Sequence, residues 1–313
     1  MDVGLPWLED FLAVIEAGGF SRAAARRHVT QPALSRRIRA LEAWIGTPLF
    51  ERNTHTVILT RAGAAFRPIA EDILRRVAAG REEALEAAHA ATGTLRFAAT
   101  HNLSQTFFPN WYRDLEARAE RGAMLQLFSA NMEACERLLI AGEVHFLLAH
   151  YHAAVPTRLP PARFQSIRLC ADRIVPVSAP AGPDAGAPRY RLPGRAGAPL
   201  PHLTYHPGSG VGRIVANALS AWEQPPFLHA TFTGPAMLLV EMARDGQGVT
   251  WSPHNLVAAD LRDGHLVPAG GPDWEIPIET RLFRPRLRLS RTAETFWTTA
   301  RRGAADEAQG AAR

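Results

Sequence analysis

The chain has 313 residues, of which 47% are hydrophobic, enough for two or three globular domains with ordinary cores. Its two cysteines, Cys135 and Cys170, form no CxxC pair, so the sequence favours neither a zinc ribbon nor a disulfide scaffold and suits a reducing compartment. No apolar run approaches the roughly 20 residues that cross a bilayer, and the first residues lack the pattern of a signal peptide. We therefore expect a cytoplasmic protein without membrane contact.

Positive charge is concentrated near the start of the chain. All 35 basic residues are arginines, and the formal net charge is +5. Between Ser21 and Arg61 lie eight arginines and only two acids, Glu42 and Glu51, so this segment alone carries +6 (8 − 2). Such a local excess is the electrostatic footprint of a DNA-binding domain.

Two short helices are predicted first. Residues Pro6–Ala17 place apolar side chains at helical spacing, and the two glycines that follow are expected to end this helix. A second helix is predicted over Ser21–His28, with Ser21 as its N-cap and three consecutive alanines that allow close packing. Val29 and Thr30 then form a tight connection.

The third helix, predicted over Thr30–Glu42, has two different faces. One face is apolar because hydrophobic residues recur at intervals of four, three and four: Leu34, Ile38, Leu41 and Ile45. The opposite face carries polar and basic side chains: Gln31, Ser35, Arg36 and Arg39. Thr30 suits the N-cap and Gly46 the end of the helix. This order of elements is the helix-turn-helix arrangement: a helix of small residues, a short turn and a basic helix. In that arrangement the second helix enters the major groove.

This helix supplies amide and hydroxyl groups for base edges at its tip and guanidinium groups for phosphates along its flank. The predicted contacts with double-stranded DNA from this region are Ser21, Arg22, Thr30, Gln31, Pro32, Ser35, Arg36, Arg37 and Arg39. The competing interpretation is a plain three-helix packing unit with exposed arginines.

A small hairpin wing is predicted after the third helix. Its strands are the short extended runs Pro48–Arg52 and Val57–Thr60, on either side of residues 53–56. Arg52 is expected to reach a phosphate or the minor groove from this wing. The alternative is that Arg52 pairs with Glu51 or faces solvent.

These motifs resemble the LysR-type transcriptional regulators. The matching run is WLEDFLAVIEAGGFSRAAARRHVTQPALSRRIRALEAWIGTPLFER, followed by ILTRAG, from Trp7 through Gly63. The family's order of Ala-Ala, Gln-Pro-Ala, Leu-Glu, Leu-Phe-x-Arg and Leu-Thr-x-x-Gly is met throughout. The resemblance implies an all-α winged helix-turn-helix head over residues 1–60 that binds DNA sequence-specifically and regulates transcription, with no enzymatic activity.

A long helix is predicted from Thr60 to about residue 91. Its apolar residues recur mostly at steps of three and four: Phe66, Ile69, Ile73, Val77, Ala84, Leu85 and Ala88. Pro68 is expected to kink the helix or loosen its first part, and Gly80 to weaken its middle. By the resemblance, residues 61–91 form the linker helix that pairs two subunits antiparallel, which implies a homodimer and, beyond it, a homotetramer. The alternative is an intramolecular packing helix.

Short apolar strands alternate with helices over the following 200 residues, which predicts an α/β fold with a mainly parallel sheet. The predicted strands are Leu95–Ala99, Met124–Phe128, Val144–Ala149, Ile174–Ser178, His202–Tyr205, Gly248–Trp251 and Arg281–Arg284. The predicted helices are Phe108–Arg118, Glu133–Ala141, Arg213–Trp222, Ala236–Arg244 and Ala293–Arg301. Residues 179–201 are predicted to be an excursion loop, and the small polar end, 303–313, a disordered tail.

This half resembles the LysR effector-binding domain, which consists of two α/β lobes like those of periplasmic binding proteins, with the chain crossing between them twice. The resemblance implies a domain over residues 92–302, with lobe one at 92–166 and 271–302 and lobe two at 167–270. The landmarks are EMARDGQGVTWSP from Glu241 and LRDGHLV from Leu261. The phrases AATHNLS, YHPGSGVGR and IPIETRLFRPRLRLSRTAETFW are most similar to regulators associated with the hypochlorite response.

Ligands of such two-lobed folds bind at strand C-termini and helix N-termini. The predicted effector-binding residues, which follow or end strands, are Thr100, His101, Asn102, Ser104, Ser129, His150, Tyr205, Thr233 and Trp251. We expect at least one of Thr100, His101 and Ser104 to contact the effector. For the others, the ordinary role of a turn or capping residue competes with ligand contact.

Other chemistries find little support in the sequence, and no cofactor or metal is expected. The segment HPGSGVGR has Arg213 where a GxGxxG motif needs glycine, and the chain has no lysine for a Walker loop. No acid or thiol accompanies His145, His150 and His152 closely enough to indicate a metal site.

Two alternatives to a regulator controlled by a small molecule or an oxidant remain. The first is a regulator that senses oxidation without a dissociable ligand, through oxidisable side chains: Cys135, Cys170, Met124, Met132, Met237 and Met242. In that set Met237 and Met242 lie in an apolar helix, where core packing is the ordinary explanation. The second is an enzyme or transport-type binding module with an added DNA-binding head.

Overall fold

The computed structural model describes residues 4–51, 57–88, 93–116, 124–182 and 186–310. The chain folds as two compact units, residues 1–90 with 140–142, and residues 91–139 with 143–313. Within the described residues, no helix combines the length and the apolar character needed to cross a membrane.

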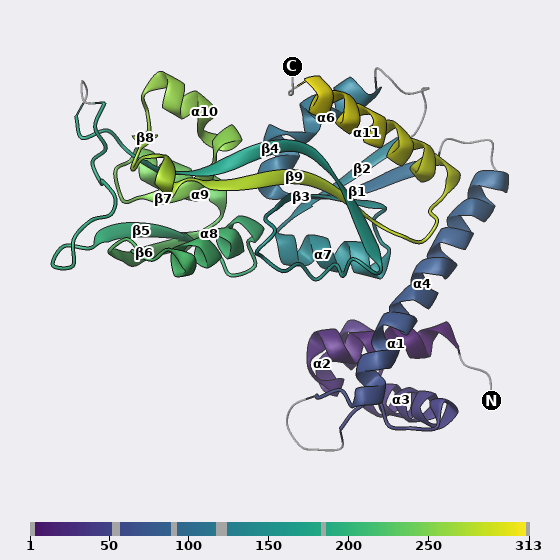
Figure 1. Ribbon diagram of the computed structural model, residues 1–313. Helices are drawn as coiled ribbons and strands as arrows, with labels where there is room; N and C mark the ends of the chain where they lie inside the picture. The colour runs from purple at the N-terminus through teal and green to yellow at the C-terminus, as the bar shows by residue number, and fades with distance from the viewer. Residues whose placement is uncertain (1–3, 52–56, 89–92, 117–123, 183–185, 311–313) are drawn as a thin grey trace. The chain divides into compact units, whose positions relative to one another are not determined.

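The first unit begins with the three predicted helices, α1 (Leu5–Ala17), α2 (Phe20–Arg26) and α3 (Gln31–Ile45) (Figure 1). Their apolar faces share one core that includes Phe11, Leu34, Ile38 and Leu41. The predicted cap at Ser21 is wrong, because α2 starts one residue earlier and its N-cap is Gly19. The earlier start places Phe20 where its ring contacts the edge of Phe50, 5.6 Å between centroids.

A fully buried carboxylate ties these helices together. Asp10 of α1 accepts hydrogen bonds from the Arg27 Nε at 2.9 Å and the Arg37 Nη1 at 3.1 Å, and its own side chain is inaccessible to solvent. Arg27 is the C-cap residue of α2 and Arg37 lies on α3, so one acid fixes the orientation of both helices relative to α1. A buried charge is tolerated when it is paired and hydrogen-bonded, as here.

The predicted wing is confirmed as an antiparallel pairing between Phe50 and Leu59. Its backbone bonds run from Glu51 N to the Ile58 carbonyl at 2.9 Å and from Thr60 N to the Leu49 carbonyl at 3.0 Å. The wing packs tightly on the next helix, because a Cβ at Gly63 would lie 2.1 Å from the Leu49 carbonyl oxygen. Arg52, the predicted wing contact, lies outside the described residues.

Helix α4 (Arg61–Ala88) is one continuous element with Pro68 inside it. Ala70 and Leu74 pack against the core of the first three helices. A second stripe, Ile69, Ile73 and Val77, is exposed to the extent of 52%, 36% and 45%. The helix therefore has an apolar face that its own unit does not cover.

In its described residues, the second unit has these strands, arranged in two sheets: β1 (Thr94–Thr100), β2 (Met124–Ala130), β3 (Phe146–Tyr151), β4 (Phe164–Ser178), β5 (Leu200–Tyr205), β6 (Leu228–Gly234), β7 (Thr250–Pro253), β8 (Val267–Pro268) and β9 (Ile276–Pro285). Its helices are α5 (His101–Thr106), α6 (Phe108–Glu116), α7 (Met132–Ala141), α8 (Gly210–Ala221), α9 (Ala236–Arg244), α10 (His254–Asp263) and α11 (Arg291–Gly310), with a single 3-10 turn at Pro272–Trp274. The larger sheet has the order β2-β1-β3-β9-β4-β7, with β8 on β4, and the smaller pairs β5 with β6.

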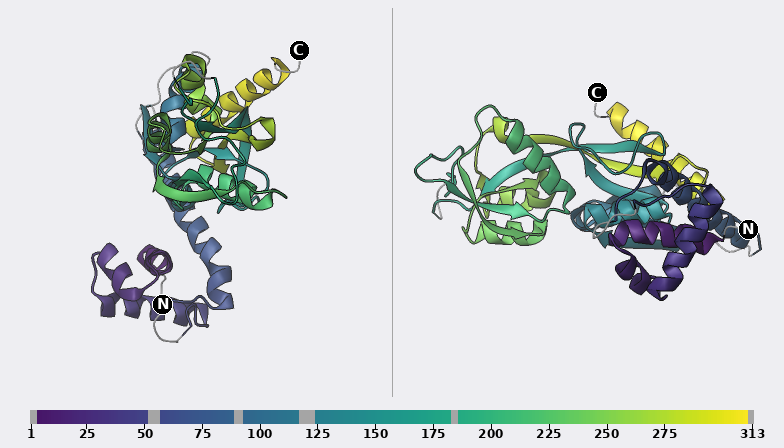
Figure 2. Two further views of the ribbon diagram at one scale, coloured as in Figure 1. Left: turned by 90° about the vertical axis from the view of Figure 1, so that its left-hand side faces the viewer. Right: turned by 90° about the horizontal axis from the view of Figure 1, so that it is seen from below.

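The expectation of a mainly parallel sheet is wrong. Strand β1 runs parallel to β2 and β3, and β5 parallel to β6, but β9 is antiparallel to β3 and β4, and β4 is antiparallel to β7 and β8. The reason is that β4 and β9 carry the chain across the unit in opposite directions (Figures 1 and 2). Two lobes lie side by side, joined by this antiparallel ribbon.

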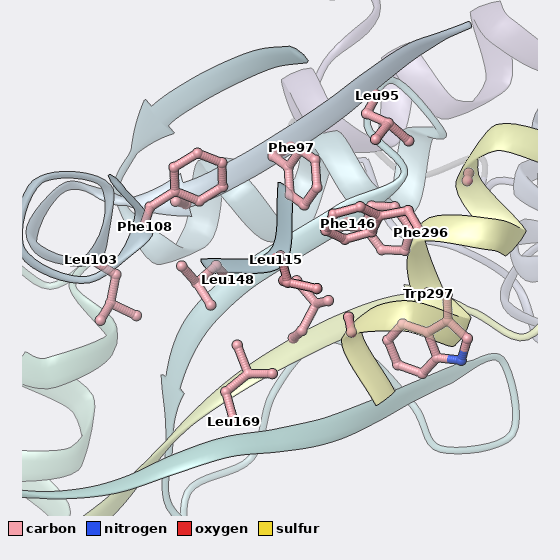
Figure 3. Close-up of a cluster of buried hydrophobic side chains, with 14 residues drawn as sticks. Leu95, Phe97, Leu103, Phe108, Leu115, Phe146, Leu148, Leu169, Phe296 and Trp297 are labelled. Carbon is pink, nitrogen blue, oxygen red and sulfur yellow. The ribbon is translucent and has the colours of Figure 1, made fainter. Parts of the chain in front are cut away.

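Each lobe has a hydrophobic core of its own. The core of lobe one gathers rings from β1, β3, α6 and α11, among them Phe97, Phe146, Phe296 and Trp297 (Figure 3). Leu169 of β4 belongs to this core, whereas Ile276 and Ile278 of β9 belong to the core of lobe two. Each crossing between lobes therefore lies a few residues later than the boundaries expected at 166/167 and 270/271. The reason is that β4 and β9 each contribute side chains to the core of one lobe before they enter the other.

The predicted disordered tail is wrong over residues 303–310, which continue α11 to Gly310. Alanine, glutamate and glutamine dominate this stretch and have high helix propensity. The last three residues, 311–313, lie outside the described part of the chain.

We predict that Asp10→Asn lowers the free energy of unfolding of the first unit by about 1–2 kcal/mol, because two charge-assisted hydrogen bonds weaken while both arginines stay partly solvated. Denaturant unfolding followed by circular dichroism measures the loss. Glu16→Gln, which neutralises an exposed acid on the same helix, is the control and should change stability little. Equal effects of the two substitutions would contradict the role given to Asp10.

Candidate functional site

The solvent face of α3 carries the polar groups predicted for DNA contact. Gln31, Pro32, Arg36 and Arg39 are exposed, and the Gln31 Nε2 lies 3.4 Å from the Ser35 Oγ. The opposite face is held in the core by Leu34, Ile38 and Leu41. Because one side of α3 is fully buried, the polar side is presented in a fixed orientation.

Two of the predicted contact arginines hold the head together. The Arg22 side chain donates to the carbonyls of Ala17 and Gly18, at 2.6 and 2.7 Å, where α1 ends. Arg37 donates to the buried Asp10. In this structure the Arg22 guanidinium therefore caps the end of α1, and the Arg37 guanidinium stabilises the contact between α3 and α1.

A cavity of about 400 Å³ lies between the two lobes of the second unit. Lobe one contributes the ends of β1, β2 and β3, and lobe two the ends of β5 and β6 with the helices that follow them. The lining residues are Thr100, His101, Asn102, Ala130, Asn131, Met132, His150, Tyr205, His206, Ser209, Gly210, Val211, Thr233, Gly234, Pro235 and Ala236. The name "interlobe pocket" is used below for this cavity.

Six of the predicted effector-binding residues line the interlobe pocket: Thr100, His101, Asn102, His150, Tyr205 and Thr233. Ser104 and Ser129 are not among the lining residues, but they form a cluster with one that is. The Ser129 Oγ lies 3.0 Å from the His101 Nδ1 and 2.9 Å from the Ser104 Oγ. These serines hold His101 in place at the rim.

Trp251 is not a pocket residue, and its prediction as one is wrong. The ring is fully buried in the core of lobe two, and its Nε1 donates to the Trp274 carbonyl at 2.9 Å. Val249, just before β7, pairs in parallel with His202 of β5, and β7 continues to Pro253. Trp251 therefore lies inside its strand and not at the strand end, where the sequence analysis places it.

Several lining residues were missed from the sequence, chiefly the first residues of helices: Asn131, Met132, Ser209, Gly210, Pro235 and Ala236. They begin α7, α8 and α9, one or a few residues beyond the strands that were recognised or, for β6, missed. Asn131 and Ser209 cap their helices, the Oδ1 accepting from Ala134 N at 2.9 Å and the Oγ from Gly212 N at 3.1 Å. The available signal was the polar residue before the helical runs of α7 and α8, whereas α9 is preceded by Pro235.

Buried polar atoms without a partner among the described residues lie at the pocket wall: Thr100 Oγ1, Asn102 Nδ2 and His150 Nε2. Asn102 and His150 are only 5% and 6% exposed. The Thr106 Oγ1 lies 3.3 Å from the Asn102 Oδ1, which leaves the amide nitrogen unpaired. Burial lowers the pKa of His150 to about 4, so its ring is neutral at pH 7.

One ion pair crosses between the lobes beside the pocket. Glu136 of α7 is fully buried and accepts from the Arg213 Nη2 of α8 at 3.1 Å and from the Arg158 backbone N–H at 3.0 Å. Arg213 also contacts a small neighbouring hollow formed with His150 and His152. Separating the lobes would leave this carboxylate without its charged partner, which is costly for a buried acid.

The oxidisable side chains differ in accessibility. Burial raises the pKa of the Cys135 thiol to about 12, so the reactive thiolate is nearly absent at neutral pH. Met132 is 3% exposed in the pocket wall, whereas Met237 is 43% exposed. The ordinary core role expected for Met237 is therefore wrong, and the one expected for Met242, which packs against a lobe-two core, is confirmed.

Two family models match the chain. The model described as "Bacterial regulatory helix-turn-helix protein, lysR family" covers residues 5–64, and "LysR substrate binding domain" covers residues 88–305. The chain is 29% identical over 296 residues to the HTH-type transcriptional regulator YjiE of Escherichia coli (strain K12), which covers 93% of this chain and 92% of that one.

Several solved structures share the fold over nearly the full length, and two of them are HypT and DarR. Full-length HypT from Salmonella typhimurium, described as a hypochlorite-specific LysR-type transcriptional regulator, has a TM-score of 0.57 and 28% identity, covering 97% of this chain and 99% of its own. DarR of Vibrio fischeri, solved in complex with DNA, has a TM-score of 0.53 and 28% identity, with coverages of 96% and 99%.

We predict that the second unit loses stability as the pH falls from 6.5 towards 4. Burial lowers the pKa of both His150 and His202 to about 4, whereas the unfolded chain takes up these protons near pH 6.5. Protonation thus favours the unfolded state across this window, and the stabilising contribution is fully present above pH 6.5.

Denaturant titrations at pH 7, 6, 5 and 4.5 measure this effect. His202→Gln should flatten the pH dependence, even if it lowers stability at pH 7 by removing the contact with Trp251. His229→Gln, at an exposed site on β6, should leave the slope as in the unaltered protein. Identical slopes in all three proteins would contradict the assignment.

Proposed function

Since the chain belongs to the LysR family of transcriptional regulators, we propose that the exposed face of α3 reads the operator and that the interlobe pocket binds the effector. The resemblance expected from the sequence is confirmed, and the protein is a LysR-type helix-turn-helix regulator with an effector-binding domain. The observation that carries the assignment of the reading face is the rigid exposure of polar side chains on a helix whose other side is core.

The contacts divide by chemistry. Gln31 and Ser35, one turn apart on α3, offer hydrogen-bonding groups to base edges. Arg36 and Arg39 flank them and suit phosphates, which position the helix without reading sequence. Ser21, Arg22, Thr30, Pro32, Arg37 and Arg52 stay predictions as DNA contacts, and Arg22 and Arg37 would have to share their guanidinium groups with the protein bonds described above.

We infer that a second copy of the chain covers the exposed stripe of Ile69, Ile73 and Val77 on α4. Large apolar side chains that recur every four residues on a helix face indicate helix–helix packing. Two heads held together read two half-sites, which raises the specificity of a helix that alone contacts few bases. Assembly into a tetramer stays a prediction.

The pocket is proposed as the control point because it is bounded by both lobes. A ligand that contacts both lobes favours their closed arrangement over an open one, in proportion to its differential affinity. In an oligomer, such a change alters the spacing of the DNA-binding heads. We propose binding without catalysis in this pocket, and a cytoplasmic location, where the DNA partner lies.

Oxidant sensing is the alternative control. The high pKa of Cys135 argues against a switch at this thiol. Met132 favours an oxidant route, because its thioether lies in the pocket wall and oxidation would make an apolar side chain polar. A response of DNA binding to hypochlorite that disappears in Met132→Leu would support this alternative over a dissociable effector.

We predict that Gln31→Ala and Ser35→Ala reduce discrimination between the protein's own promoter and unrelated duplex by about 1–3 kcal/mol per lost base contact. Arg39→Ala should instead weaken binding to both duplexes alike and reduce the salt dependence. Fluorescence anisotropy at several salt concentrations measures both effects. Arg81→Ala, on α4, is the control. A uniform loss for all α3 variants would contradict the proposed division, and unchanged binding would contradict the reading face.

We predict that Ile69→Glu with Ile73→Glu converts the dimer to monomers, because burying two carboxylates against an apolar partner helix is unfavourable. Sedimentation velocity measures the mass, and circular dichroism checks that α4 still forms. Ala64→Glu introduces the same side chain at an exposed position on the side of α4 opposite to the stripe. A dimer that survives the double change places the subunit interface elsewhere.

A further inference from the structure

We propose that the interlobe pocket takes a small organic monoanion, a carboxylate on a short apolar body. This ligand class rests on the proposed function of the pocket as the effector site. It follows from four properties of the wall: its lack of fixed charge, the helix ends that meet there, its unpaired donors and its apolar patch.

The described wall of the pocket contains no aspartate, glutamate or arginine side chain. In the ion pair beside the pocket, the charge of Glu136 is already compensated by Arg213. A phosphate dianion is usually bound by arginine or lysine, which this wall lacks. A cationic ligand would need a carboxylate, which it also lacks. The ligand charge that remains compatible is zero or one negative.

Besides the short helix α5, three longer helices begin at the pocket: α7, α8 and α9, of 10, 12 and 9 residues. Each of these three N-termini carries roughly half a positive charge, so together they can offset at least one negative charge. On α8 the cap at Ser209 satisfies Gly212, and Gly210 and Val211 at its first turn line the pocket. On α9 the N-cap is Pro235, whose side chain accepts no bond. These ends favour an anion over a neutral ligand.

An independent observation points the same way. The Asn102 Nδ2 is a donor, buried at the wall and without a partner among the described residues. An unpaired buried donor costs free energy, and a ligand oxygen removes that cost. His150 Nε2 is unpaired nearby and belongs to a neutral ring, so it adds a hydrogen-bonding site without a second charge.

The rest of the wall is apolar. Ala130, Met132, Val211, Pro235 and Ala236 supply hydrocarbon and thioether surface in a cavity of about 400 Å³. Pockets of this size suit organic ligands and are too large for a bare halide to fill. A carboxylate therefore has room for a short branched or cyclic body.

Thermal unfolding of the full-length protein tests the proposal with four compounds that share one ring: cyclohexanecarboxylate, its amide, cyclohexylmethylammonium and cyclohexyl phosphate. Sodium sulfate holds the ionic strength constant, and sodium bromide is a separate arm. We expect the carboxylate alone to raise Tm, by a few degrees at about 100-fold excess over its Kd. A shift as large with the amide, the ammonium, the phosphate or bromide, or none with the carboxylate, overturns the proposal.

Two variants locate the binding. Asn102→Asp exchanges the unpaired donor for a negative charge, and Thr233→Asp adds a charge at an exposed lining position where folding is least affected. Each should weaken carboxylate binding at least tenfold. Asn110→Asp, the same change on the outer surface of α6, should bind as the unaltered protein does. Binding that survives both pocket variants places the anion elsewhere and overturns the proposal.

The same titrations followed by DNA binding separate the two levels of inference. If the carboxylate binds in the pocket and leaves DNA binding unchanged, the ligand class holds and the pocket is not the control point. DNA binding could instead respond to an uncharged or cationic compound, with a response that is equally large in the Thr233→Asp variant. In that case the control function is separate from this site, and the proposed ligand class is wrong for the effector.

Discussion

The antiparallel ladder between β4 and β9 is the constraint on which the second unit depends. It pairs Phe164 with Pro285 at one end and Ile174 with Ile276 at the other, so two strands of opposite direction lie in both lobes. The backbone hydrogen bonds of this ladder join strands of both lobes into one continuous sheet. Because the lobes share this ribbon, the ends of β1, β2 and β3 face the ends of β5 and β6 across one pocket.

The buried polar groups of the protein are of two kinds, those that are fully paired and those that are not. In the first unit Asp10 is fully paired, and the pairing gives α3 a fixed orientation. Glu136 is paired in the same way between α7 and α8. At the pocket wall, however, Asn102 and His150 keep atoms without partners among the described residues. Unpaired buried groups are rare and costly, so these two at the pocket wall support the proposal that a ligand binds there.

Charge is distributed accordingly. The DNA-binding head is rich in arginine. Some of these arginines bond to helix ends or to the buried Asp10, whereas Arg36 and Arg39 are exposed on α3. The described wall of the pocket, in contrast, has no arginine, aspartate or glutamate side chain, and helix ends and neutral polar groups meet there. Long-range attraction suits a polyanion such as DNA, whereas a small ligand is selected by short-range geometry inside a cavity.

The sequence by itself determined the helix-turn-helix, the wing, the long helix and most strands, because local spacing, caps and apolar period specify these elements. It also placed Thr100, His101, Asn102 and His150 at strand ends that do line the pocket. Tertiary structure alone decided that Trp251 is core and that Arg37 pairs with Asp10, since both depend on contacts between residues distant in sequence. It also decided the antiparallel sense of β4 and β9, because strand direction follows from how the chain crosses between lobes and not from the period of its side chains.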